Sequence, residues 1–248
     1  MAGVDAMISV AAVSPLGGLG RLRLRCFSAA DQDALVQMHR DPRVRELLID
    51  DFPLDDRRFV SAFLTRMQAF YAEHPGLGIW ATEHWFASLS EDHPDYPDAV
   101  EALSPASLAR ALQPRPHFAG WFNLMPMTGR PEEVELGCRL IPSAWGLGLA
   151  MDGGALLLDH AFDRLGRERV WAVCHPRHGS VHLRLRMLGF EYDGDRPYDG
   201  VPSSHFVVGA DAWRHQRALP SAARRRQALA WVKSHRSSDL DSGAPFPE

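Results

Sequence analysis

The sequence feature that most constrains the fold is a glycine-rich turn between two strand-like segments. Residues 133–141 alternate apolar and polar side chains, which is typical of a strand with one buried face. Gly146 and Gly148 follow, and a helical apolar pattern begins directly after them. Residues 169–174 then predict a second strand. Because glycines let backbone N–H groups close on an anion at a helix N-terminus, this stretch predicts a phosphate-binding turn between two adjacent strands.

A strand and two helices are predicted at the N-terminal side of this turn. Residues 21–27 alternate strictly and predict the first strand. Ser28 and Asp31 have the spacing of a capping box, with Asp in place of Glu or Gln, and the helix that they open should stop before Pro42. Residues 55–74 repeat aromatic side chains at helical spacing. We expect this aromatic face to belong to the core; the alternative is that part of it lines an acceptor pocket.

The middle of the chain predicts more strands, interrupted by a long insertion. Residues 76–82 predict a strand, and 118–124 with 134–140 predict a hairpin. Between them, 87–116 is acidic and proline-rich at first and then carries a helix start at Ser104 and Pro105. A structureless connection of this length is unusual in a compact domain, so the insertion is either a substrate-side lid or a plain surface addition.

Composition and charge restrict the partners of the protein. The net charge of −4 gives no general attraction to nucleic acid or to an anionic membrane. The basic run Arg224–Arg226 is therefore interpreted as a solvated or intramolecularly docked helix face rather than a nucleic-acid site. The three cysteines are odd in number and far apart, so neither a disulfide framework nor a metal site is expected.

The N-terminal segment does not predict a signal peptide. Residues 1–20 lack a basic n-region and contain Asp5, and no apolar run is long enough to span a bilayer, so we expect a cytoplasmic protein. After a basic helix near 180–188, residues 203–209 predict a last strand. The predicted organisation is a flexible leader (1–20), a main domain (21–210, with the insertion at 87–116), a basic helical extension (211–236) and a disordered tail (237–248).

Three motifs in this order resemble the GNAT acyltransferase superfamily, and more narrowly its ribosomal-protein N-terminal acetyltransferase-like branch. They are Glu135-Leu-Gly137, then Trp145-Gly-Leu-Gly-Leu-Ala150, then Leu188-Gly-Phe190, and the resemblance covers roughly 20–210. It implies an α/β (α+β) fold, with a mixed, mostly antiparallel sheet flanked by helices. In that fold the fourth and fifth strands splay apart to admit acetyl-CoA.

The resemblance also implies which residues bind the co-substrate. Pyrophosphate would bind the backbone amides of Gly146 to Ala150, and the amides of Cys138 to Leu140 would serve the pantetheine arm and the oxyanion. The alternative is a tight strand-to-helix turn without a ligand. The predicted acetyl-CoA-binding residues are Cys138, Arg139, Leu140, Trp145, Gly146, Leu147, Gly148, Leu149, Ala150 and His178.

Glu135 is the candidate general base, because the resemblance implies an acid at this place that deprotonates the incoming amine. Strand alternation puts it on one face with Glu133, so the alternative is an ordinary solvated strand face. After the fifth strand, where the family commonly has Asn and then Ser, this chain has His178 and Ser180, and Ser180 is the second candidate catalytic residue. The helix at 180–188 has no tyrosine for a general acid, and Tyr192 and Tyr198 are only distant candidates.

The predicted function is direct transfer of an acetyl group from acetyl-CoA to a primary amine, on a protein N-terminus or a small molecule. The alternative is a non-catalytic GNAT-fold protein that binds acyl-CoA. Arg177, Arg184 and Arg186 would pair with the CoA phosphates or form a solvated helix face. The acidic residues of 90–101 would suit a cationic acceptor. A homodimer is possible, and neither nucleic acid nor a membrane is expected as a partner.

Overall fold

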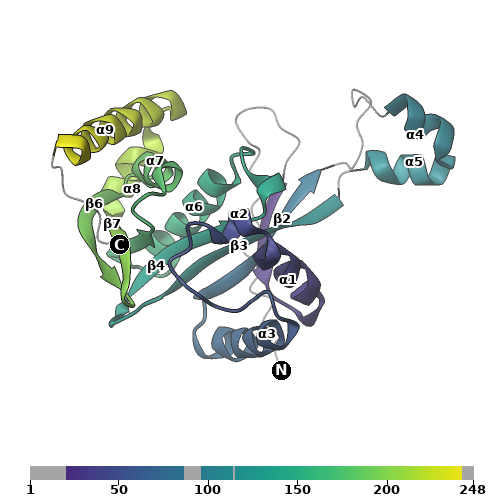
Figure 1. Ribbon diagram of the computed structural model, residues 1–248, viewed down its shortest axis with the longest axis horizontal. Coiled ribbons are helices and arrows are strands. Elements are labelled where there is room, and N and C mark those ends of the chain that lie inside the picture. Colours follow the sequence, from purple (N-terminus) through teal and green to yellow (C-terminus); the bar gives the residue numbers. More distant parts are fainter. Residues whose placement is uncertain (1–20, 87–95, 114, 242–248) are drawn as a thin grey trace.

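Seven strands form one mixed sheet in the order β1-β2-β3-β4-β5-β7-β6. The computed structural model describes residues 21–86, 96–113 and 115–241 (Figure 1). All neighbouring strands are antiparallel except β4 and β5, which are parallel, so the predicted mixed, mostly antiparallel sheet is confirmed. The strands are β1 (Arg21–Cys26), β2 (Gly78–Phe86), β3 (Arg115–Met127), β4 (Arg130–Leu140), β5 (Arg169–Cys174), β6 (Glu191–Tyr198) and β7 (Val201–Gly209).

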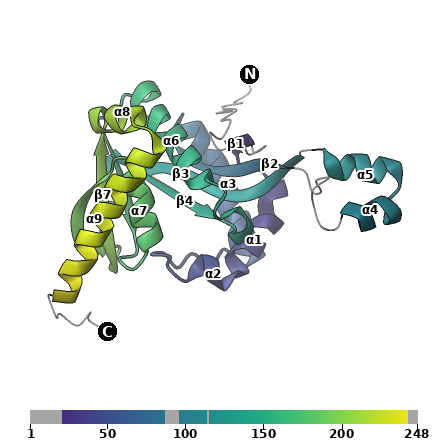
Figure 2. The ribbon, with the colours of Figure 1, turned by 90° about the horizontal axis from the view of Figure 1, so that it is seen from above.

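Helices cover both faces of this sheet. The first three helices lie on one face, and α6 to α9 lie on the other, as the two views together show (Figures 1 and 2). The helices are α1 (Gln32–Arg40), α2 (Pro42–Arg45), α3 (Arg57–Glu73), α4 (Tyr96–Ala102), α5 (Pro105–Leu112), α6 (Leu149–Asp159), α7 (Gly179–Met187), α8 (Ala210–Ala218) and α9 (Ser221–Asp241).

Two neighbouring residues of β3 show how the core is divided between the two faces. Trp121 points to the first face, where its ring stacks on Phe63 of α3 at 5.8 Å and lies 5.0 Å from His39 of α1. Phe122 points to the opposite face, is fully buried, and meets α6 at Gly153. The alternation of one strand therefore fills both halves of the core.

The capping box at the start of the first helical segment is confirmed. The backbone N–H of Ser28 donates to the Asp31 carboxylate at 2.8 Å, in a short 3-10 turn (Ala29–Asp31) that leads into α1. Arg25, near the end of β1, donates to both oxygens of Asp31, at 2.6 and 2.8 Å, and so holds the capping box against this strand. α1 ends at Arg40, before Pro42, as the sequence predicts.

The strand β6 was not predicted from the sequence. It contains Gly194 and Pro197, both typical of turns, which hide its strand character. β6 pairs only with β7, so it lies at the edge of the sheet, where proline and glycine are tolerated. The short helices α2 and α4 were also missed, because each is only a few residues long.

The C-terminal extension differs from the prediction in two ways. It forms two helices instead of one, because the chain breaks at Leu219 and Pro220, where proline cannot continue a helix. α9 also continues to Asp241, so residues 237–241 are helical where a disordered tail was predicted. The predicted leader at 1–20 and the remaining tail at 242–248 lie outside the described residues.

The basic helix α9 docks on the protein itself. The Trp231 ring lies 6.1 Å from Phe206 of β7, and the guanidinium of Arg186 on α7 lies 5.1 Å above the same ring. This is the intramolecular dock that was one of the two expected explanations of the basic extension. Arg186 also donates to the carbonyl of Phe190, so it serves the packing of α7 and α9 rather than a phosphate.

The insertion forms a pair of helices, α4 and α5, at the far end of the β2–β3 hairpin (Figure 2). It joins the hairpin where Phe86 pairs with Arg115, whereas Glu135 pairs with Met125, ten residues further along β3. At about 3.3 Å per residue, the two places are roughly 30 Å apart. This distance favours the surface addition over the lid. The acidic residues at 91–95 lie outside the described residues.

Across the described ranges, every helix is either too short or too polar to cross a lipid bilayer.

We predict that Gly153→Ala destabilises the protein. A Cβ atom at this position would lie 2.3 Å from the ring of Phe122, and relieving that overlap should cost about 1–3 kcal/mol. Alanine gains about 1 kcal/mol over glycine in a helix, so the net loss of stability should reach about 2 kcal/mol. Gly209→Ala is the matched control, because its nearest neighbour would be 3.7 Å away. Denaturant unfolding measures both, and equal stabilities of the two variants would contradict the prediction.

Candidate active site

The site begins where β4 and β5 separate. The two strands pair only at Val134 with Val170 and at Glu135 with Trp171. Beyond Glu135, β4 remains paired with β3 as far as Leu140, and β5 remains paired with β7. The predicted splay between the fourth and fifth strands is therefore present, and it opens directly after the candidate base.

The glycine turn that follows β4 presents a row of unused amides. Gly146 and Gly148 have φ angles of 80° and 82°, in the left-handed region that favours glycine. Among the described residues, no acceptor is found for the backbone N–H groups of residues 146–150, whereas those of Met151 and Asp152 bond to the carbonyl of Gly148. A Cβ on either glycine would meet nothing within 4 Å, so the space in front of the amides is open. These five amides at the start of α6 fit an anionic group such as a pyrophosphate.

The end of β4 supplies further amides to the gap. Ile141 donates its N–H to Ala119 of β3 at 3.0 Å. Because successive amides of a regular strand point to opposite sides, the N–H of Arg139 also faces β3, and those of Cys138 and Leu140 face the gap. Of the three predicted oxyanion donors, Cys138 and Leu140 therefore point their N–H groups into the gap, and Arg139 does not.

Trp145 fixes the turn to the strand that precedes it. Its indole N–H donates to the carbonyl of Leu140 at 2.9 Å, while the residue remains 47% exposed beside the equally exposed Leu147. The predicted binding role of Trp145 thus has a structural component, because the indole holds the glycine turn against the end of β4.

Gly137 of the Glu135-Leu-Gly137 motif lies beneath the side chain of Asn123. A Cβ on this glycine would lie 2.5 Å from the Asn123 amide oxygen, so no larger residue fits without displacing it. In the amide orientation that satisfies both partners, Asn123 bonds the N–H and the carbonyl of Gly137, each at 3.2 Å. The Asn123 side chain therefore covers Gly137, which lies two residues after Glu135 on the same face of β4.

Glu135 lies half-buried on the first face of the sheet, at the point where β4 and β5 diverge. Burial raises the pKa of its carboxyl to about 7, against the hydrogen bond from Tyr198, which lowers it; the charges of Asp199 and Asp50 raise it further. A carboxyl with a pKa near neutrality is suited to proton transfer at physiological pH. The environment of Glu135 thus differs from that of an ordinary solvated strand face.

Glu133 shares that face, as alternation predicted, but not its environment. It forms ion pairs with Arg130, at 3.0 Å, and with Arg169. These two arginines also lie over the ring of Trp171. Glu133 is therefore part of a structural ion-pair cluster at the start of β4, and for this residue the non-catalytic interpretation is the better one.

Tyr198 is the site residue that sequence reasoning gave too little weight. Its hydroxyl donates to Oε2 of Glu135 at 2.6 Å, although the two residues are 63 positions apart. Burial, together with the charge of Glu135 and this hydrogen bond, raises the pKa of Tyr198 to about 12. The missing signal was the strand β6, since only the position of Tyr198 at its end reveals the contact.

His178 and Ser180 come together at the start of α7. Nδ1 of His178 lies 3.2 Å from the Ser180 hydroxyl, and burial lowers the pKa of His178 to about 4, so its ring is neutral at neutral pH. Arg184 of α7 donates to the carbonyl of Ser180, and its charge reaches the exposed thiol of Cys138 across the gap. The start of α7 therefore borders the same opening as β4.

Arg139 sends its side chain away from the gap, into a buried cluster on the first face. Its guanidinium bonds Nε2 of His39 at 2.7 Å and Asp50 at 2.5 Å, and it stacks over Trp121 at 4.7 Å. Nδ1 of His39 in turn bonds the carbonyl of Leu35 at 2.8 Å. This cluster fixes the segment between α2 and α3 on the same face of the sheet that carries Glu135.

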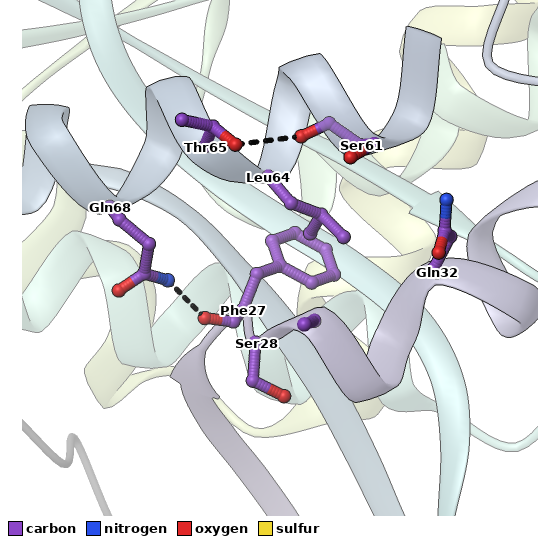
Figure 3. Close-up of a pocket in the computed structure, with 8 residues that line it drawn as sticks. Phe27, Ser28, Gln32, Ser61, Leu64, Thr65 and Gln68 are labelled. Atoms are coloured by element: carbon purple, nitrogen blue, oxygen red, sulfur yellow. Dashed lines mark hydrogen bonds between the residues drawn. The ribbon is translucent and has the colours of Figure 1, made fainter. Parts of the chain in front are cut away.

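A surface pocket of about 340 Å³ lies elsewhere, between the end of β1 and α3 (Figure 3). Phe27 forms its floor, and Gln68 closes one end by donating to the Phe27 carbonyl. Its lining is formed by uncharged side chains, so it lacks the groups that acyl transfer needs. The candidate site is therefore the β4–β5 opening.

Within the described part of the chain, no group of three or more His, Cys, Asp or Glu side chains is arranged to hold a metal ion.

Comparison with known proteins agrees with this geometry. The model of the acetyltransferase (GNAT) domain matches residues 21–191, a range that includes β4, the glycine turn, α6, β5 and α7. The chain belongs to the GNAT acetyltransferase family. It is therefore an acyltransferase.

Solved structures similar to this GNAT acetyltransferase confirm its fold. RimJ of Mycobacterium smegmatis, in complex with CoA-disulfide, has a TM-score of 0.56 and 16% identity over 83% of this chain and 88% of its own. Spermidine N-acetyltransferase of Vibrio cholerae, in complex with CoA and spermine, has a TM-score of 0.55 and 10% identity, and the match covers 78% of this chain and 98% of its own. A GCN5-related N-acetyltransferase of Brucella melitensis has a TM-score of 0.52 and 18% identity, and the match covers 85% of this chain and 82% of its own.

We predict that His39 makes the stability of this GNAT acetyltransferase sensitive to acid. Burial lowers the pKa of His39 to about 4 in the folded state, against about 6.5 when unfolded. Below pH 6.5 the unfolded chain binds a proton that the folded state does not, so stability falls as the pH falls from 6.5 to 4, by up to about 3 kcal/mol.

Denaturant unfolding at several pH values between 4 and 7 measures this effect. His39→Gln should show a shallower loss of unfolding free energy than the wild type. His74→Gln, which replaces an exposed histidine, should retain the wild-type slope. Identical slopes for wild type and His39→Gln would contradict the assignment.

Proposed function

We propose that the protein transfers the acetyl group of acetyl-CoA directly to a primary amine, with Glu135 as the general base. The observation that carries the proposal is the position of a half-buried carboxyl, whose pKa is raised to about 7, at the point where β4 and β5 diverge. Family membership supplies the class of reaction, and the raised pKa supports a proton-accepting role at neutral pH.

The amides at the start of α6 would hold the diphosphate of acetyl-CoA. Gly146 to Ala150 offer five unused N–H groups at the positive end of the α6 dipole, in open space. A side chain at either glycine would require a strained backbone, and the open space around both glycines supports the approach of a bound group.

The reaction exchanges one acyl bond for another. The amine nitrogen bonds to the thioester carbon, the bond from that carbon to sulfur breaks, and Glu135 accepts the proton that the amine loses. The amides of Cys138 and Leu140 would donate to the carbonyl oxygen as it gains negative charge. No covalent acyl-enzyme is needed.

Ser180 would assist the leaving thiolate. If neutral His178 carries its proton on Nδ1, it donates to the oxygen of Ser180, and the serine O–H is then free to donate toward the sulfur. The observed distance of 3.2 Å supports this pairing. His178 would thus act through Ser180, in place of the direct contact with the co-substrate that the resemblance implied.

The acceptor would be an amine on a protein N-terminus or on a small molecule, approaching Glu135 on the first face of the sheet. RimJ is among the similar structures, which fits the ribosomal-protein N-terminal acetyltransferase-like branch, and a spermidine acetyltransferase is among them as well. Because these two neighbours differ in their names and ligands, the proposal that the acceptor is an amine rests on Glu135 as a base and not on either neighbour.

We predict that Glu135→Gln lowers kcat/KM by about 10²–10⁴-fold, because the amine then lacks its base. Glu133→Gln, the same change two residues earlier on the same face, should leave most of the activity. Release of free CoA thiol in a screen of peptide and polyamine acceptors measures turnover. Full activity of Glu135→Gln with the acceptor that the wild type prefers would rule out the proposed base.

We predict that Gly148→Glu weakens acetyl-CoA binding at least tenfold, because a carboxylate would stand before the anion-binding amides and the residue would be strained at a φ of 82°. Isothermal titration with acetyl-CoA measures the affinity. Gly166→Glu is the control for strain, since Gly166 has a φ of 61° but lies between α6 and β5, away from the glycine turn. Equal affinities for wild type and Gly148→Glu would mean that the turn is only structural.

A further inference from the structure

The β6–β7 turn brings Tyr198 to the candidate base. Tyr198 is the last residue of β6, and Asp199 and Gly200 turn the chain into β7 with φ angles of 49° and 83°. A left-handed conformation is uncommon for any residue other than glycine, although aspartate tolerates it better than most. The conformations of Asp199 and Gly200 therefore define the turn, and the turn fixes the position of the Tyr198 backbone from which the ring extends.

The Tyr198 hydroxyl is held from two sides. It donates to Oε2 of Glu135 at 2.6 Å and accepts from the backbone N–H of Thr128, in the β3–β4 turn, at 3.3 Å. His205 of β7 lies edge-on to the tyrosine ring at 5.8 Å. Two separate segments therefore hold the hydroxyl, whose hydrogen is directed at the carboxylate, and a third packs against the ring.

We propose that Tyr198 is a positioning residue for acetyl transfer, whose hydroxyl holds Oε2 of Glu135 and leaves Oε1 for the proton of the incoming amine. Within the described ranges, no hydrogen bond to Oε1 of Glu135 is found. The inference rests on the proposed function of Glu135, since a tyrosine can only position a base that the reaction uses.

The proposal has a physical reason beyond orientation. A hydrogen bond to an ionised carboxylate is stronger than one to the neutral acid, so Tyr198 favours the form of Glu135 that accepts a proton. Around Glu135, burial and the charges of Asp50, from the α2–α3 segment, and Asp199, from the β6–β7 turn, act in the opposite direction. Without the Tyr198 hydroxyl, every remaining influence would favour the protonated, inactive form.

The first test is the titration of the Glu135 carboxyl itself, which requires no acceptor. In ¹³C NMR of protein labelled at glutamate carboxyl carbons, the signal absent from Glu135→Gln identifies Glu135. We expect a midpoint near pH 7 in the wild type and a midpoint about one unit higher in Tyr198→Phe. Tyr192→Phe is the matched control: it removes a hydroxyl from the same strand, where the ring packs on Phe206, and should leave the midpoint unchanged.

The second test is the pH dependence of kcat/KM with the best amine found in the acceptor screen. Tyr198→Phe should lose about tenfold in activity below pH 7 and approach the wild type near pH 9, because the raised midpoint is then passed. A tyrosine with only a structural role would lower activity or stability without moving the profile.

The two proposals fail in different ways. An unchanged Glu135 midpoint in a folded Tyr198→Phe variant would overturn the positioning role, whatever the activity. Full activity of Glu135→Gln would instead overturn the general base, even if the midpoint moved as expected.

Discussion

The parting of β4 and β5 is the constraint on which the rest of the site depends. Two parallel strands that pair at only two positions leave the later backbone groups of β4 without a neighbour on that side. Buried backbone amides are seldom left without a partner, so such an edge favours a bound group. The same divergence turns the chain into the glycine loop at 146–148 and brings the start of α7 to the other border of the opening. The proposed phosphate-binding turn, oxyanion donors and general base thus all depend on one interruption in the sheet.

Much of the fold could be predicted from the sequence, because its decisive signals are local. The capping box at Ser28, the alternation in β4 and the two glycines before α6 each act within a few residues, and each is found as predicted. The edge strand β6 could not be predicted, because Gly194 and Pro197 are tolerated there only through its place in the sheet. Since that strand was missed, Tyr198 could not be connected to Glu135.

The two acidic residues of β4 show why site assignments need the structure. Glu133 and Glu135 share a face and a spacing, and nothing local distinguishes them. The difference arises from distant partners: Arg169 neutralises the first, whereas Tyr198 and burial act on the second. Likewise, Arg139 was assigned to the co-substrate through its backbone, and its side chain is engaged by His39 and Asp50. Such contacts join segments that the sequence keeps far apart.

The position of the helical insertion determines where this enzyme can accept new sequence. α4 and α5 follow the end of β2 and precede the start of β3 at the tip of the β2–β3 hairpin, far from the opening between β4 and β5. Closing a longer loop between two fixed strand ends costs little additional entropy, about 0.6 kcal/mol for each doubling of its length. The hairpin tip therefore isolates the catalytic half from events at its end. New sequence can be acquired, exchanged or fused there, and the chemistry at the other end of the same strands need not be rebuilt.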